Sequence, residues 1–233
     1  MSFWKVNIFV LCCIVSSCNS LDFKNKQSFS DIASIIVVEE GEKYIKNSYS
    51  IFSSLSLDTI PEGTCGLASY FVDYDNQLSD KLPFNAELIS WNTLDVSSFQ
   101  LEPEIISDEY TNTIVSIVST TLVDQFLFLP ITQRMSYDSV FDYELLCNTD
   151  SVDSREVINM YLRARLVTQG ADTTKTDRNV MLTFNILPFL EQQVLQGNDS
   201  LIQFNLNYAN KFDSETGLRY LSYKSNPVKI LLR

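Results

Sequence analysis

The sequence contains no histidine in 233 residues. This absence excludes catalysis by Ser-His-Asp or Cys-His groups, a histidine general base and zinc sites with histidine ligands. Glycine is also scarce, with six residues and no glycine-rich phosphate loop. We therefore expect no nucleotide and no other cofactor, and no metal site built on histidine.

Basic residues are too few to balance the acidic ones. The chain has 17 Lys and Arg against 29 Asp and Glu, so its formal net charge is −12. Nucleic-acid binding requires a basic surface that neutralises phosphates. We therefore expect no nucleic-acid partner.

A long apolar run is missing as well, but a short one stands at the N-terminus. Residues 6–15 are apolar except for Asn7, which is too short for a membrane span of about 20 residues. The following Val15-Ser16-Ser17-Cys18 resembles a bacterial lipobox. It predicts that residues 1–17 are a signal peptide, that Cys18 is lipidated, and that the membrane is a partner through this lipid anchor, in the cell envelope at the outer membrane. An ordinary cleaved signal or a short membrane-buried anchor are the alternatives.

Two cysteines, Cys65 and Cys147, remain beyond the predicted lipidation site. In an oxidising compartment they could pair in a disulfide. The alternative is that both are buried as small hydrophobic residues.

Alternation with a period of two residues runs through most of the chain and predicts an all-β fold. Residues 157–167 could suit a helix, but their strict alternation favours a strand. Proline near its start and glycine after its end indicate one helix at 188–196. Residues 18–30 are polar and predict a flexible tether, and the acidic stretch 101–109 indicates a boundary between two β parts. The expected strands cover 35–38, 49–57, 64–74, 84–96, 112–121, 125–129, 143–147, 157–167, 180–186, 202–208, 218–223 and 228–232.

This layout resembles the NigD-like lipoproteins of Bacteroidota. The segments that carry the resemblance are Val15–Cys18, Pro61–Tyr70, Tyr161–Arg165, Leu182–Ile186 and Leu206–Tyr208. The resemblance implies an OB-like N-terminal β domain over 31–107 and a C-terminal β-sandwich over 108–233. It brings no activity with it.

Acidic side chains form two candidate sites. Asp73, Asp75 and Asn76, with Asp80, could supply oxygen ligands for calcium, or form a polar hairpin end. Asp138, Asp142 and Glu144 could include a carboxylate pair for glycoside hydrolysis. In a chain with 29 acids such pairs also arise by chance.

Trp91 is a candidate for stacking on a sugar ring, with packing in the core as its alternative. Arg163 and Arg165 alternate with the apolar residues of their strand, so we expect a solvated strand face rather than an anion site.

Taken together, these observations assign no catalytic residue and no metal ligand. The expected function is a non-enzymatic binding module whose partner is another envelope protein or a polysaccharide. Two other classes stay open: a fimbrillin-like subunit of a surface fibre, and a glycan-processing enzyme that uses paired carboxylates.

Overall fold

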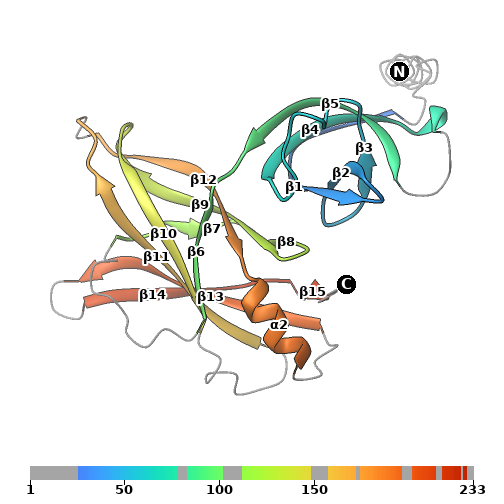
Figure 1. The fold of residues 1–233 in the computed structure, drawn as a ribbon. Coiled ribbons are helices and arrows are strands. Elements are labelled where there is room, and N and C mark those ends of the chain that lie inside the picture. Colours follow the sequence, from blue (N-terminus) through green and yellow to red (C-terminus); the bar gives the residue numbers. More distant parts are fainter. Residues whose placement is uncertain are drawn as a thin grey trace, which may run out of the picture.

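The computed structural model describes residues 26–77, 83–101, 112–147, 157–171, 174–195, 201–213, 217–226 and 228–229. The predicted signal peptide and Cys18 lie outside these residues. The all-β prediction is confirmed: the described elements are strands, one 3₁₀ turn and the α-helix α2 (Leu187–Leu195), and they form a small barrel beside a larger sheet (Figure 1).

The N-terminal unit is a closed barrel of five strands in the order β1-β2-β3-β5-β4. Its β3–β5 pair is parallel and its other pairs are antiparallel, which is the order of an OB-type barrel. A two-residue turn at Glu40 and Gly41, with φ values of 53° and 87°, joins the first hairpin. The strands are β1 (Lys26–Glu39), β2 (Glu42–Lys46), β3 (Ile51–Ser53), β4 (Cys65–Asp73) and β5 (Phe84–Thr93), and the 3₁₀ turn η2 (Tyr74–Asn76) follows β4.

The barrel core follows from alternation along its strands. In β4, Ala68, Tyr70 and Val72 are all buried and point into the barrel. Phe52 of β3 packs on Tyr70 with ring centroids 4.7 Å apart, and Asn47 donates a hydrogen bond of 2.8 Å to the buried Tyr70 hydroxyl. The buried Tyr70 is therefore both packed and hydrogen-bonded.

The second unit is one ten-stranded sheet that curls until it is nearly closed. Eight strands follow the order β14-β13-β11-β10-β6-β12-β9-β7, while β15 pairs with β13 and β8 with β9. The strands are β6 (Val96–Leu101), β7 (Ser116–Ile117), β8 (Thr121–Val123), β9 (Phe126–Met135), β10 (Val140–Cys147), β11 (Val157–Thr168), β12 (Thr176–Asn185), β13 (Leu201–Asp213), β14 (Gly217–Lys224) and β15 (Val228–Lys229).

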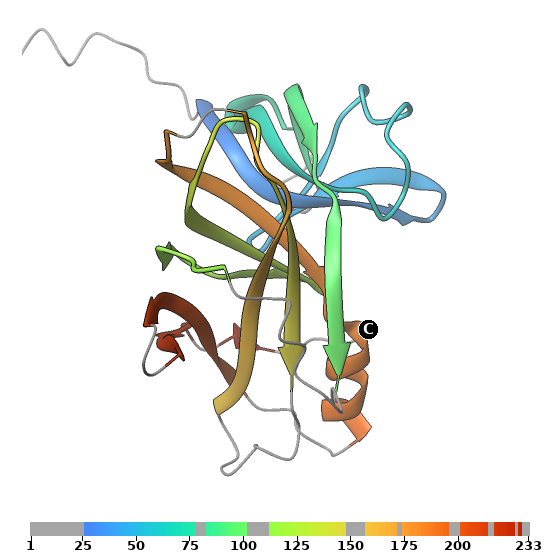
Figure 2. The same ribbon diagram turned by 90° about the vertical axis from the view of Figure 1, so that its left-hand side faces the viewer.

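The inner faces of these strands share one large hydrophobic core. Helix α2 contributes the fully buried Phe189 to it, and the Phe189 ring meets that of Phe204 at 6.2 Å. Figures 1 and 2 both place α2 at one end of the large sheet, and the β9–β10 turn, the end of β11 and the start of β12 at the opposite end. The helix thus covers one end of this core.

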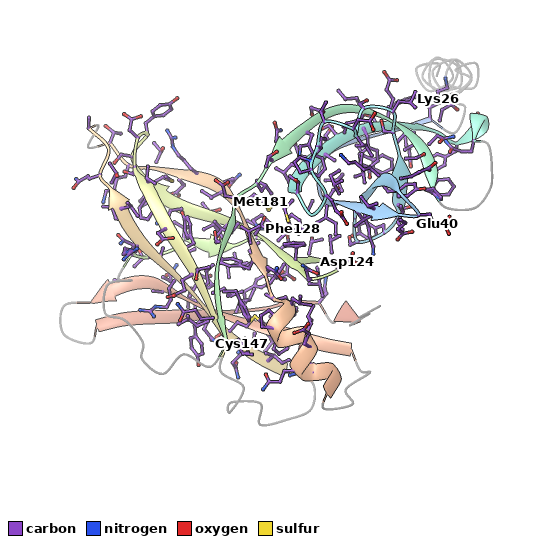
Figure 3. The ribbon with its side chains drawn as sticks, viewed as in Figure 1. Lys26, Glu40, Asp124, Phe128, Cys147 and Met181 are labelled. Atoms are coloured by element: carbon purple, nitrogen blue, oxygen red, sulfur yellow. The ribbon has the colours of Figure 1, made fainter. Side chains whose placement is uncertain are left out.

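A separate hydrophobic cluster joins the two units. Ile35 and Cys65 of the barrel pack with Val123, Phe126 and Phe128 of the large sheet. Figure 3 shows Phe128 and Met181 between the two units. Strand β9 is buried on both faces, because Leu127 and Leu129 point into the large core while Phe126 and Phe128 point toward the barrel. This explains its continuous apolar run.

An ion pair borders the same junction. Lys46 Nζ of β2 lies 2.5 Å from Asp124 Oδ1, and Asp124 sits in the turn between β8 and β9 with a φ of 50°. Within the part of the chain that the structure describes, the barrel and the large sheet therefore meet through apolar packing and through the Lys46–Asp124 ion pair.

The two cysteines lie in different places. Cys65 is in the junction cluster and Cys147 is in the large core, and no disulfide joins them. Burial raises the pKa of the Cys65 thiol to about 12. Of the two possibilities that the sequence left open for these cysteines, the structure shows burial as small hydrophobic residues.

Strand pairing corrects two borders of the expected layout. Strand β1 begins at Lys26, inside the segment 18–30 that we expected to be a tether, because residues 26–29 pair with β4. Strand β6 pairs with β10 and β12, so the second sheet begins before the acidic stretch and not after residue 107. The division into two domains itself stays a prediction.

The strand expected at 49–57 is much shorter in the structure. Asn47 Oδ1 accepts hydrogen bonds from the backbone amides of Tyr49 and Ser50 at 2.8 and 2.9 Å, which turns the chain there. After Ser53 the chain leaves the sheet as a loop. The strand at 157–167 and the helix at 188–196 are confirmed to within one residue at each end. Among the described residues, no helix combines the length and the apolar character that a membrane crossing requires.

Candidate functional site

A groove of about 680 Å³ opens on the barrel. Its walls come from the start of β2, the end of β3 with the loop that follows, and the start of β5. These segments are brought together by the parallel pairing of β3 with β5, in which Ser53 lies opposite Asn85. The lining residues are Gly41, Glu42, Lys43, Ser53, Ser54, Leu55, Leu57, Asp58, Asn85 and Ala86.

Lys43 holds one wall of this groove in place. Its Nζ donates hydrogen bonds to the backbone carbonyl oxygens of Asp58 and Ile60, both at 2.8 Å, and to that of Leu57 at 3.5 Å. An ammonium group has three donors, so these contacts use all of them. The lysine therefore fixes the loop that follows β3 and has no donor left for a ligand.

The remaining polar groups of the groove are acidic or neutral. Glu42 accepts a hydrogen bond of 2.9 Å from the Tyr44 hydroxyl, and this contact raises the pKa of Tyr44. Ser53 Oγ donates a hydrogen bond of 2.7 Å to Asn85 Oδ1. The Asn85 amide nitrogen takes no part in this bond. Asp58 adds a second carboxylate. The groove offers hydroxyl, amide and carboxylate groups for hydrogen bonding.

Apolar side chains complete the groove. Leu57 is buried in the barrel core and supports the floor, whereas Leu55 is fully exposed. An exposed leucine beside hydroxyl and amide groups suits a ligand that has both polar and apolar faces. The arrangement is that of a binding surface.

Trp91 lies in β5 outside the groove and packs against the barrel core. It lies opposite Ala68, and its indole covers Gly66 so closely that a Cβ at Gly66 would come within 2.5 Å of the ring. Its Nε1 is buried without a hydrogen-bond partner. Trp91 is not among the groove residues, and its role in ligand stacking stays a prediction.

Two of the candidate catalytic carboxylates have arginine partners. Asp142 Oδ2 accepts a hydrogen bond of 2.8 Å from Arg165, and Glu144 Oε2 lies 3.7 Å from Arg163. Glu144 also accepts a hydrogen bond from Gln100. Both carboxylates are therefore engaged by arginine side chains of the neighbouring strand.

This arrangement corrects the expectation for Arg163. Its side chain is only 5% exposed, and that of Glu144 is 7% exposed, so the pair is buried instead of lying on a solvated face. Arg165 is 39% exposed and fits the expectation better.

The acidic residues at the end of β4 have structural roles. Asp73 accepts the backbone amide of Asp75 and caps η2, and it forms an ion pair of 3.0 Å with Lys26. Asp80 and the side chain of Asn76 lie outside what the structure describes. Across the described part of the chain, no group of three or more His, Cys, Asp or Glu residues could hold a metal ion.

Sequence reasoning missed the groove, because it missed β2. Residues 42–46 are mostly charged or polar, so their alternation is weak. The signal that could have found them is the Glu40-Gly41 pair, since glycine at a two-residue turn indicates a hairpin.

The fold is shared with solved structures from Bacteroidota. An uncharacterised protein from Parabacteroides merdae matches with a TM-score of 0.64 at 12% identity, over 86% of this chain and 96% of that one. A candidate lipoprotein from Bacteroides fragilis gives 0.61 at 13%, over 87% and 99%. A NigD-like immunity protein from Bacteroides caccae gives 0.52 at 12%, over 85% and 95%.

These matches show a common fold and nothing more. Their sequence identities are too low to show that this chain belongs to a family with these proteins. No family model matches the sequence, and no curated protein matches it. The resemblance drawn from the sequence is confirmed at the level of fold: this chain has the two-part β architecture that a NigD-like protein also has.

Proposed function

We propose that this protein is a lipid-anchored, non-enzymatic binding protein of the bacterial cell envelope, and that its barrel groove holds a neutral oligosaccharide. The barrel groove is the observation that carries the proposal. OB-type barrels bind oligonucleotides and oligosaccharides on the face of β2 and β3 and on the neighbouring loops. The groove of this barrel includes the start of β2, the end of β3 and the start of β5.

Charge separates these two ligand classes. The groove contains the carboxylates of Glu42 and Asp58, and its one lysine is already bonded to three backbone carbonyls. The two carboxylates outnumber the one lysine, so phosphate groups would meet a net negative charge, which opposes nucleic-acid binding. Sugar hydroxyls can donate to carboxylates and accept from the Asn85 amide, so a neutral oligosaccharide fits the groove chemically.

The membrane anchor fits the layout of the chain. Lys26, the first residue of β1, follows Cys18 by eight positions. A chain of that length spans at most about 29 Å, so acylation of Cys18 would keep the barrel close to the membrane. The matches to Bacteroidota proteins, one of them a candidate lipoprotein, support a location in the envelope, and we place the protein at the outer membrane.

The absence of catalysis is part of the proposal. The arginine partners of Asp142 and Glu144 argue against glycoside hydrolysis by these residues. A protein of the envelope is the alternative partner for the groove.

Two measurements test the proposal. Incorporation of a palmitate analogue into the wild-type protein but not into Cys18→Ala would support the anchor, and labelling of neither would refute it. Isothermal titration with neutral oligosaccharides would test the groove. We expect Asn85→Ala to weaken binding about five- to tenfold, the loss of one or two hydrogen bonds.

Asn92→Ala is the matched control, because Asn92 is an exposed residue of the same strand outside the groove. Equal loss in both variants, or no saccharide binding by the wild type, would contradict the proposed ligand. Cleavage of a bound saccharide would contradict the non-enzymatic function.

A further inference from the structure

We infer that the end of the large sheet opposite helix α2 is a second binding site, and that it takes an acidic sugar unit such as a uronic acid. A cavity of about 230 Å³ opens there, between the turn that joins β9 to β10, the end of β11 and the segment at Asn112. That volume matches a single sugar ring. The inference goes beyond the barrel groove and does not depend on it.

Gln133 forms the floor of this cavity. It points the same way as Leu129 and Ile131, which belong to the large core, and it is 1% exposed. Its amide nitrogen donates a hydrogen bond of 2.9 Å to the backbone carbonyl oxygen of Thr113. A backbone carbonyl can only accept, so this bond fixes the orientation of the amide.

The other atom of that amide has no partner. Gln133 Oε1 is buried and makes no hydrogen bond in the structure. A buried acceptor without a donor is costly, and such groups are rare in folded proteins. A ligand hydroxyl at the cavity floor would supply the missing donor.

The walls are suited to a sugar ring. Ser136, Ser139 and Gln169 line the cavity with hydroxyl and amide groups, and Phe141 and Leu166 supply apolar surface. Gly170 donates a backbone hydrogen bond of 3.1 Å to Ser139 Oγ, which ties the β11–β12 connection to the β9–β10 turn. A Cβ at Gly170 would come within 3.1 Å of the backbone of that turn, so the two connections are closely packed.

The rim carries positive charge. Lys175 lines the cavity and is exposed, and no ion pair of Lys175 occurs within the described residues. Arg134 also lines it, but its guanidinium is bonded to Asp177 at 2.7 and 3.1 Å. Arg178, which pairs with Gln133 across the strands, lies 4.6 Å from the centre of the Tyr137 ring.

Among the described residues of this region, the cations of Lys175, Arg134 and Arg178 stand against the carboxylates of Asp177 and the exposed Asp138, which is an excess of one positive charge. Tyr137 lies in the β9–β10 turn between the lining residues Ser136 and Ser139, is 70% exposed, and has the Arg178 guanidinium over its ring. An exposed aromatic ring beside the cavity can stack on the apolar face of a sugar. The ligand that fits has hydroxyl donors, a ring with an apolar face and a carboxylate for Lys175.

Titration of the purified full-length protein with sodium glucuronate, followed by protein NMR shifts, tests the inference, with glucose as the neutral probe. We expect glucuronate to bind about three- to fivefold more tightly than glucose, the strength of one exposed ion pair. Lys175→Gln should remove this difference, and 0.5 M salt should reduce it. Tyr137→Ala should weaken both sugars.

Lys224→Gln is the matched control. Lys224 is an exposed lysine of β14 opposite Asn205, level with Asn159 near the other end of β11. Equal binding of the two sugars, or an equal effect of Lys224→Gln and Lys175→Gln, would overturn the acidic ligand. Shifts confined to the barrel, or absence of binding, would overturn the site. An Asn85→Ala variant that keeps this binding would separate the site from the barrel groove.

Discussion

Replacing Phe128 with alanine tests whether the barrel and the large sheet unfold together. Phe128 belongs to β9 of the large sheet, is fully buried, and packs in the cluster that contains Ile35 and Cys65 of the barrel. Removing a buried phenylalanine side chain costs about 3–5 kcal/mol. The total stability of a domain is about 5–15 kcal/mol, so this loss is a large share of it.

The assay uses Trp91 as a reporter of the barrel. It is the only tryptophan beyond Trp4, and it packs against the barrel core. We expect tryptophan fluorescence and far-UV circular dichroism to give the same urea midpoint in the wild type. Phe128→Ala should lower the midpoint seen by Trp91, although residue 128 is not in the barrel. For a chain of this size the thermal midpoint should fall by roughly 6–20 °C.

Two further variants complete the test. Phe128→Leu should shift the midpoint in the same direction by a smaller amount, and it serves if the alanine variant does not fold. Tyr137→Ala changes an exposed residue of the β9–β10 turn and removes only its exposed cation–π contact with Arg178, so it should lower stability by no more than about 1 kcal/mol. A Trp91 midpoint that does not move in either Phe128 variant would refute the coupling of the two units.

Three other outcomes are expected. Arg163→Met should lower the free energy of unfolding in urea by about 3–5 kcal/mol, because it leaves Glu144 buried without its cation. Adding Glu144→Gln should recover part of that loss. Additive effects in this double-mutant cycle would argue against a coupled pair. Gly66→Ala should cost about 1–3 kcal/mol and change the Trp91 fluorescence because the new Cβ meets the indole, whereas an unchanged spectrum would contradict this contact. Burial raises the pKa of Cys65 to about 12, so the folded protein keeps the thiol proton at a pH where the unfolded chain has lost it. The free energy of unfolding should therefore fall between about pH 9 and 12. Cys65→Ala should show a smaller fall, and an equal fall in both proteins would contradict the assignment.

Local rules determined much of the fold. Alternation in residues 157–167 and 180–186 depends on the two-residue period of a strand, which any sheet must satisfy. The helix predicted at 188–196 follows from a proline that suits a first turn and from a following glycine, a residue type that commonly ends helices. Burial of Cys65 and Cys147 could also be inferred from the sequence, because cysteines outside disulfides behave as small hydrophobic residues.

Features that depend on residues distant in the sequence could not be predicted from the sequence. Arg163 looks like a solvated residue in its own strand, but Glu144 of the neighbouring strand meets it and both are buried. Lys43 likewise reads as a surface lysine until the loop after β3 folds back onto it. A sequence gives the identity of a charge, and only the tertiary structure decides its partner and its exposure to water.

The same division applies to the candidate sites. The sequence by itself determined the chemistry that is excluded, through the missing histidines, and it determined the all-β class through its periodicity. The tertiary structure decided where ligands could bind, because Ser53 and Asn85 meet only through strand pairing and Gln133 faces a cavity only where the β9–β10 turn and the end of β11 converge. Strand periodicity is a local property of the chain, whereas a binding site is made by residues that the fold brings together from distant positions.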